Sequence, residues 1–217
     1  MVCAGTSSFA AVAIISAYGD PPPAKATRLA VDALSGGDIV GLPTDTVYGL
    51  AADPFHTGAS DRLFRLKSRP RAVGLPVLVA GEEQALGLCT AVPKVARRLM
   101  ERYWPGPLTL VLPRRPDLDA DLGEDDETIG IRCPAHPVPL AICGRLGPIA
   151  TTSANRHGEP PLTTAEEVAK ALGCEVVLVL DAGKCDQPPS TVVDCTGEAP
   201  KVLREGPVPA HEVAALA

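Results

Sequence analysis

Residues 39–50 read IVGLPTDTVYGL, an apolar run that leads directly into a cluster of hydroxyl and carboxyl side chains. The run at 39–42 is typical of a buried β-strand. Pro43 cannot donate a hydrogen bond to a sheet and therefore ends or borders this strand. The polar residues 44–46 follow at once, and polar side chains beyond a strand end are typical of a ligand site on an α/β sheet. The alternative is a local turn in which these hydroxyls bond only the backbone.

Apolar periodicity and turn residues predict mixed secondary structure on both sides of this segment. Helices are expected at 25–35, 60–68, 93–103, 137–144, 163–172 and 209–216, and strands at 39–42, 75–80, 108–112, 128–132, 149–152, 176–180, 191–194 and 201–203. The helix at 163–172 opens with a threonine pair followed by glutamate, the signature of a capping box. Strands and helices do not alternate strictly, so the sequence predicts an α/β fold with one twisted, mixed β-sheet flanked by helices. A length of 217 residues suits a single domain.

The composition excludes several classes of protein. A net charge of −6 argues against a protein whose whole surface binds nucleic acid, although it allows a local basic cleft. The seven cysteines include no CxxC pair and no spacing typical of zinc ligands, so we expect reduced cysteines in a cytoplasmic protein. The apolar run at 9–15 is too short to span a membrane and lacks the basic residues that precede a secretory signal. We interpret it as an extra strand or an N-terminal extension.

Five basic residues lie between positions 62 and 71, and the chain has neither a Walker loop nor a GxGxxG motif. Side chains therefore have to bind any phosphate. Lys67 and Arg69 suit this task as a point charge and a forked guanidinium two residues apart, and Arg71 adds to them. The alternative is a solvated helix face, and we expect the helix at 60–68 to turn its basic residues, Lys67 among them, toward the solvent.

Further polar residues follow the predicted strands in the second half of the chain. Ser153 and Asn155 lie just beyond a strand, where hydroxyl, amide and backbone N–H groups can bind phosphate or ribose, although an ordinary turn is the alternative. Arg132 ends another strand, and its guanidinium can bind a carboxylate through two parallel hydrogen bonds. Arg204 could equally form a surface ion pair. Trp104 heads a proline-rich turn and is expected to pack rather than to bind a ligand.

Six segments in register carry a resemblance to a known family. They are PTDTVYGL at 43–50, KSRP at 67–70, WPGPLTLVL at 104–112, IRCPAH at 131–136, TSAN at 152–155, and STVVD at 190–194 followed by VLREG at 202–206. This set resembles the YrdC-like family of threonylcarbamoyl-AMP synthases over residues 25–210. The resemblance implies the YrdC-like fold and a reaction that condenses L-threonine, bicarbonate and ATP. The products would be threonylcarbamoyl-adenylate and pyrophosphate, and the adenylate would serve N6-threonylcarbamoylation of adenosine 37 in tRNA.

The resemblance also implies roles for individual residues. It places Lys67 and Arg69 in catalysis. It places ATP contacts at Lys67, Arg69, Arg71, Thr128, Ser153, Asn155, Pro161 and Arg204. It places threonine contacts at Thr44, Arg132, Thr151 and Ser190. Any metal would be Mg²⁺ brought with ATP and held by phosphates and water, with no protein side chain as ligand.

The expected organisation is an N-terminal extension at 1–24, a catalytic domain at 25–210 and a C-terminal tail at 211–217. The expected partners besides the substrates are a downstream threonylcarbamoyl transferase complex and tRNA, reached indirectly or transiently, with no membrane. Two alternatives stay open at this stage. One is a non-catalytic relative that binds double-stranded RNA or acts in ribosome maturation, and the other is a module that forms carbamoyl-adenylate.

Overall fold

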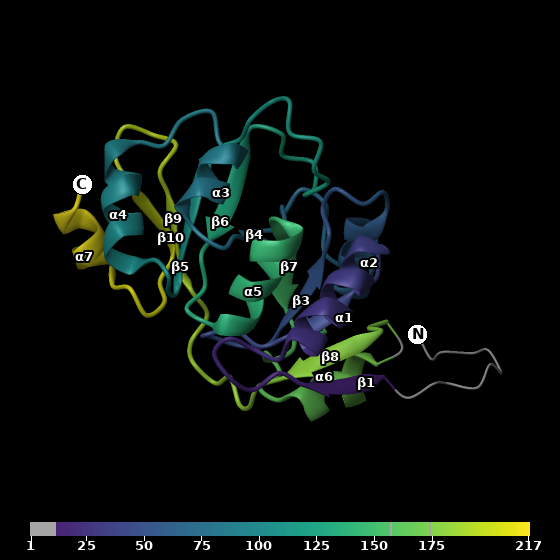
Figure 1. Cartoon of the computed structure of the whole chain (residues 1–217). Helices are drawn as coiled ribbons and strands as arrows, with labels where there is room; N and C mark the ends of the chain where they lie inside the picture. The colour runs from purple at the N-terminus through teal and green to yellow at the C-terminus, as the bar shows by residue number, and fades with distance from the viewer. Residues whose placement is uncertain (1–11, 157, 174) are drawn as a thin grey trace.

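A ten-stranded mixed β-sheet forms the centre of the structure, which is a computed structural model describing residues 12–156, 158–173 and 175–217 (Figure 1). The strand order is β1-β8-β2-β3-β7-β4-β6-β5-β9-β10. The strands are β1 (Ala13–Ser16), β2 (Val40–Leu42), β3 (Gly49–Ala52), β4 (Val77–Leu78), β5 (Leu108–Pro113), β6 (Thr128–Arg132), β7 (Ile149–Ser153), β8 (Leu178–Asp181), β9 (Thr191–Asp194) and β10 (Lys201–Arg204). Parallel and antiparallel pairs both occur, which confirms the predicted mixed sheet.

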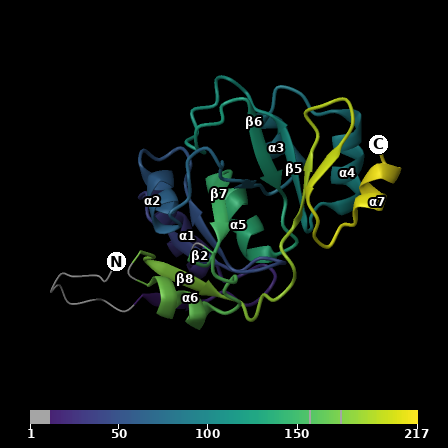
Figure 2. The same ribbon diagram turned by 180° about the vertical axis from the view of Figure 1, so that it is seen from behind.

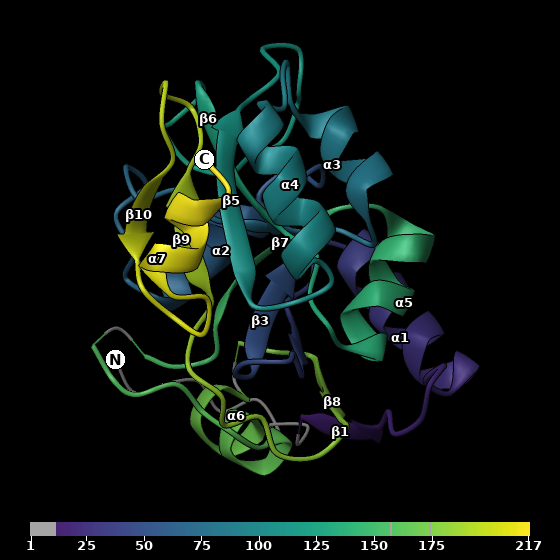
Figure 3. The ribbon, with the colours of Figure 1, turned by 90° about the vertical axis from the view of Figure 1, so that its left-hand side faces the viewer.

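Helices cover both faces of this sheet. They are α1 (Ala24–Ser35), α2 (Ala59–Leu66), α3 (Glu82–Leu88), α4 (Lys94–Tyr103), α5 (Pro137–Leu146), α6 (Ala165–Leu172) and α7 (Ala210–Ala215). Helices α1 and α5 lie on one side and α2 and α6 on the other, as the views from opposite sides and from the edge show (Figures 2 and 3). Leu34 and Ile142 of the first pair pack with Leu42 of β2, whereas Leu63 and Val168 of the second pair pack with Leu50 of β3. This is the two-sided covering expected of an α/β sheet.

The predicted helices and strands are present, with boundaries that shift by a few residues. The capping box is formed by Thr164 and Glu167, one residue later than the first threonine of the pair. Strand β3 and helix α3 were not predicted. Strand β1 corresponds to one of the two interpretations of the run at 9–15, an extra strand or an N-terminal extension. Strand β1 pairs with β8 at the edge of the sheet, so this part of the predicted extension belongs to the sheet, and residues 9–11 lie outside the described residues. The division of the chain at residue 25 stays a prediction.

The hairpin of β2 and β3 positions the polar segment that follows residues 39–42. The two strands pair antiparallel, with Leu42 opposite Gly49, and so the residues from Pro43 to Tyr48 form the connecting loop. Strand β3 also pairs antiparallel with β7, which places Gly49 opposite Ser153. The two polar segments, about a hundred residues apart in sequence, therefore meet at one place in the sheet.

Candidate functional site

A cavity of about 450 Å³ lies over one face of the central strands, a size typical of sites for small ligands. Several neighbouring strands line it, mostly through residues two positions apart, because side chains alternate between the faces of a strand. The series comprises Thr109 and Val111 of β5, Thr128, Gly130 and Arg132 of β6, Thr151 and Ser153 of β7, and Ser190 and Val192 at β9. The expected location beyond the strand ends is therefore only partly right. The cavity also extends over the face of the sheet.

The loop between β2 and β3 forms one wall of this cavity and is held by its own hydroxyls. The Thr44 hydroxyl donates to Val47 O at 2.7 Å and accepts from Thr46 N at 3.1 Å. The turn considered as an alternative is therefore present. Thr44 and Thr46 nevertheless line the cavity, so the turn and the wall of the site are the same structure.

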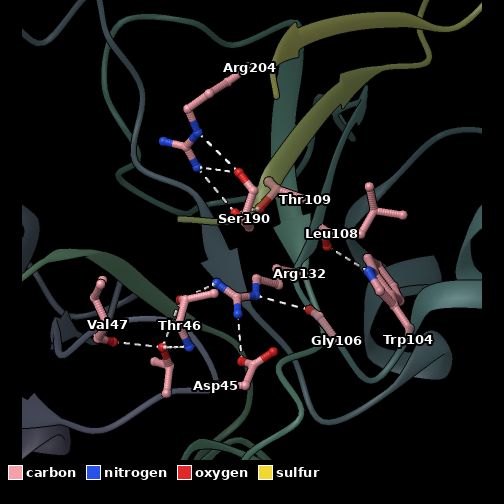
Figure 4. Close-up of polar contacts among 11 residues, drawn as sticks. Asp45, Thr46, Val47, Trp104, Gly106, Leu108, Thr109, Arg132, Ser190 and Arg204 are labelled. Atoms are coloured by element: carbon pink, nitrogen blue, oxygen red, sulfur yellow. Dashed lines mark hydrogen bonds and ion pairs between the residues drawn. The ribbon is translucent and has the colours of Figure 1, made fainter. Parts of the chain in front are cut away.

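Arg132 ties this loop to the rest of the site. Its side chain is buried and donates to Gly106 O at 3.1 Å, Thr46 Oγ1 at 3.0 Å and Asp45 Oδ1 at 2.5 Å (Figure 4). A guanidinium has five N–H donors, so two remain for a ligand in the cavity that Arg132 lines. Burial lowers the pKa of Arg132, and the Asp45 carboxylate opposes that shift. The second oxygen of Asp45 is buried without a hydrogen-bond partner in the described part of the chain.

Two arginines meet at the cavity without acidic partners. Arg69 donates to Val73 O at 2.7 Å and Gly74 O at 2.8 Å, and Arg204 donates twice to Ser190 O, at 2.8 and 3.1 Å. Neither arginine forms an ion pair with a carboxylate of the described residues. Burial and then the Arg204 charge lower the pKa of Arg69. Two neighbouring cations without counter-ions at a cavity are suited to bind a polyanion.

Lys67 is buried, although it was expected to face the solvent. Its side chain is only 5% exposed and does not line the cavity. Nζ donates to Ser153 O at 3.0 Å, to Asn155 O at 2.7 Å and to Asn155 Oδ1. The prediction of a solvated position was wrong because Lys67 follows the last turn of α2, from where its side chain extends beneath the loop after β7. Burial lowers its pKa to about 8, with a further contribution from the Arg69 charge, while Glu159 opposes the shift.

Arg71 is engaged away from the cavity. It forms ion pairs with Asp61 and Asp121, both at 2.5 Å, and its guanidinium stacks on the Phe64 ring at 4.7 Å. The structure does not bring it to the cavity lining. Its position fits a structural connection between α2 and the acidic segment at 116–127.

Trp104 and His136 have local structural roles. Trp104 donates from its indole nitrogen to Leu108 O at 2.8 Å and packs against the core, which agrees with the predicted architectural role. His136 Nδ1 accepts from Val138 N at 3.2 Å and caps α5.

The remaining predicted residues fall into two groups. Pro161, Thr128, Thr151 and Ser190 line the cavity, whereas Asn155 lies behind Ser153 in contact with Lys67. Sequence reasoning missed several lining residues, among them Thr109, Val111, Asp125, Gly130, Thr152 and Val192. The signal that could have found some of them is a spacing of two residues along a strand, as in the pairs 109/111, 128/130 and 190/192, where a hydroxyl-bearing residue and the residue two positions later lie on the same face.

Other classes of site find little support among the described residues. Cys89, Cys133, Cys143, Cys185 and Cys195 are free thiols, and all five are buried. Within residues 12–156, 158–173 and 175–217, no three His, Cys, Asp or Glu side chains come together as metal ligands. No helix in the same part of the chain has the length and apolar character needed to cross a membrane.

Comparison with known proteins decides the family. The profile of the Sua5, YciO and YrdC proteins, which carries the description "Telomere recombination", matches residues 32–206. The chain belongs to this family. A Mycobacterium tuberculosis protein provisionally named a threonylcarbamoyl-AMP synthase is 42% identical over 186 residues, which cover 85% of this chain and 86% of that protein. The threonylcarbamoyl-AMP synthase of Bacillus subtilis is 38% identical over 200 residues, covering 91% of this chain and 57% of its own length.

A solved structure of a family member shows the same fold. The structure of Pyrococcus abyssi Sua5 complexed with L-threonine superposes with a TM-score of 0.83 at 33% identity, covering 94% of this chain and 60% of that chain. The chain thus spans somewhat more than half the length of the B. subtilis and P. abyssi proteins. The resemblance drawn from the six sequence segments and the predicted YrdC-like fold are both confirmed.

Proposed function

We propose that this chain forms L-threonylcarbamoyl-adenylate and pyrophosphate from L-threonine, bicarbonate and ATP. The observation that carries the proposal is a single cavity that combines two kinds of polar side chain. Arg69 and Arg204 supply unpaired positive charge, and the hydroxyls of Thr109, Thr151 and Ser190 supply partners for a small polar substrate. The curated relatives are named for this activity, and P. abyssi Sua5 has been solved with L-threonine.

The reaction sets the requirements for the site. The threonine amine forms a bond to the carbon of bicarbonate, with loss of water, and gives a carbamate. A carbamate oxygen then attacks the α-phosphorus of ATP, the bond to the β-phosphate oxygen breaks, and pyrophosphate leaves. Both reactants of the second step are anions, so the main tasks are alignment and neutralisation of charge. Arg69 and Arg204 would neutralise the charge of the phosphates.

Threonine would contact Thr44, Arg132, Thr151 and Ser190 in this cavity. The two free N–H groups of Arg132 are available for its carboxylate, while Asp45 keeps the guanidinium oriented. Hydroxyl partners such as Thr151 would favour threonine over an amino acid without a hydroxyl, because their polar groups would otherwise lose a partner. Thr128, Ser153 and Pro161 would border the nucleotide.

Mg²⁺ would enter with ATP. The carboxylate that lines the cavity is Asp125, and it already accepts from Glu127 N at 2.9 Å, Thr128 N at 3.1 Å and the Thr128 hydroxyl. Its oxygens are therefore largely engaged, which fits a metal held by phosphates and water rather than by a protein cage. The ion would neutralise phosphate charge when bound, and Arg69 and Arg204 would orient the same phosphates.

The proposal includes a cytoplasmic location and delivery of the adenylate to a threonylcarbamoyl transferase complex that modifies tRNA. A catalytic domain at 25–210, between an extension and a tail, is also part of it. Neither alternative is favoured by a specific observation in the cavity.

Pyrophosphate release tests the proposed function. We expect release from ATP only when L-threonine and bicarbonate are both present, with a product whose mass equals threonylcarbamoyl-adenylate. Serine and valine are the comparison amino acids. Valine should give a lower rate of pyrophosphate release than serine, because valine lacks the hydroxyl. Equal release with threonine, with valine and with no amino acid would refute the proposal.

A further inference from the structure

The Lys67 ammonium is fully engaged by the loop that follows β7. An ammonium has three N–H donors. All three have acceptors here, namely Ser153 O at 3.0 Å, Asn155 O at 2.7 Å and Asn155 Oδ1. No donor is left for a phosphate, and the side chain does not line the cavity.

Two of these acceptors are backbone carbonyls on either side of Ala154, so Lys67 holds the main chain of the loop. The opposite side of the loop is held by Ala154 itself. Its N–H donates to Tyr48 O at 2.7 Å, and its carbonyl accepts from Leu162 N at 2.8 Å. The loop is therefore fixed between Lys67 on one side and the β2–β3 loop and Leu162 on the other.

Lys67 also determines which hydrogen-bonding role Ser153 can play. By donating to Asn155 Oδ1, it fixes the orientation of the Asn155 amide, whose nitrogen donates to Glu159 O. The Ser153 hydroxyl donates to the same Oδ1 at 2.8 Å. Its hydrogen is thereby committed, and only lone pairs remain for the cavity. The group next to Ser153 should then be an O–H or N–H donor, such as a ribose hydroxyl, rather than a phosphate oxygen.

We propose that Lys67 is a positioning residue that fixes the loop at 153–155 and makes Ser153 a hydrogen-bond acceptor, while Arg69 and Arg204 bind the phosphates. The inference rests on the proposed function. It gives different roles to Lys67 and Arg69, two residues of one motif that the sequence had suggested both bind phosphate.

The proposal has a consequence for pH. A neutral amine keeps two donors against the same three oxygens, so one contact with the loop is lost when Lys67 deprotonates. The charged groups that face Lys67 are Arg69, which favours deprotonation, and Glu159, which opposes it. The pKa of Lys67 is lowered to about 8. Activity should therefore fall above about pH 8, and this alkaline limb should be absent from the residual activity of a Lys67→Met variant.

The decisive experiment compares Lys67→Met with Arg69→Met. Calorimetry of AMP and ATP binding measures whether a loss depends on the number of phosphates. We expect Lys67→Met to weaken AMP and ATP by the same factor, within about threefold, since it acts through the loop. Arg69→Met should weaken ATP at least about tenfold more than AMP. A loss in Lys67→Met that grows from AMP to ATP as in Arg69→Met would overturn the proposal.

Hydrogen exchange of residues 149–162 without nucleotide gives an independent readout. Exchange should accelerate in Lys67→Met and stay at the wild-type rate in Arg69→Met. If wild type binds no ATP, the proposed function fails, while this exchange comparison still tests whether Lys67 fixes the loop at 153–155. Unchanged exchange in Lys67→Met would refute the proposal that Lys67 fixes this loop, even in an active enzyme. Should Lys67→Met not fold, Asn155→Ala replaces it, with accelerated exchange and the same uniform loss of AMP and ATP expected.

Discussion

Replacement of Arg132 by methionine should destabilise the fold by about 3–5 kcal/mol, because it leaves a buried carboxylate without its partner. The Arg132 and Asp45 side chains are 8% and 13% exposed, so water can replace little of the lost interaction. The substitution also removes the donors to Gly106 O and Thr46 Oγ1. Asp45→Asn keeps an oxygen for Arg132 and loses only the charge, so about 1–3 kcal/mol is expected.

Urea unfolding of wild type, the two single variants and the double variant measures these free energies. The double variant should be destabilised by at least about 1 kcal/mol less than the sum of the single variants, because both remove the same interaction. Arg62→Met is the matched control. Its ion pair with Asp38 has an N–O distance of 3.0 Å, but the side chains are 51% and 40% exposed, and less than about 1 kcal/mol is expected. A cost below about 1 kcal/mol for Arg132→Met, or additive single variants, would refute the reasoning.

Three further predictions concern other parts of the molecule. The pKa of Lys67 is about 8 in the fold and 10.5 ordinarily, so the unfolded chain binds more protons between these values and stability rises with pH there. The free energy of unfolding of wild type relative to Lys67→Met should therefore increase from pH 8 to pH 10.5, and a decrease would contradict the burial of the ammonium. Arg69→Met and Arg204→Met should each lower the rate of pyrophosphate release by about one to three powers of ten, and unchanged rates in both would show that the pair does not bind phosphate. Thr164→Ala should cost about 1 kcal/mol in urea unfolding through loss of the cap of α6, against less than about 0.5 kcal/mol for Thr163→Ala, and equal costs would argue against the capping box.

Local sequence signals predicted most elements because their causes are local. The apolar face of α1 ends at Gly36, and the capping box of α6 was visible in the threonines and glutamates at its start. Strand β3 was missed since Gly49–Ala52 is short, made of small residues and leucine, and buried at every position. Its four residues have no alternation to reveal a strand, and only pairing with β2 and β7 defines it.

The candidate site was predictable in its residue types and less so in its geometry. The motif around Lys67 and Arg69 was correctly recognised as a cationic segment. Its two members nevertheless have different surroundings, because Lys67 contacts residues 86 and 88 positions away in sequence. The ion pair between Arg132 and Asp45 joins positions 87 apart for the same reason. Contacts of this kind depend on strand order, which a local pattern does not encode.

The sequence by itself determined the family, the mixed sheet and many of the polar residues that line the cavity, because each follows from motifs and periodicities within a few residues. The tertiary structure decided what each polar group does. It buried Lys67, paired Arg71 with Asp61 and Asp121, and left Arg69 and Arg204 beside the cavity with no acidic partner among the described residues. The physical reason is that burial and pairing set the charge and the free donors of a side chain, and both depend on segments brought together only by the register of distant strands.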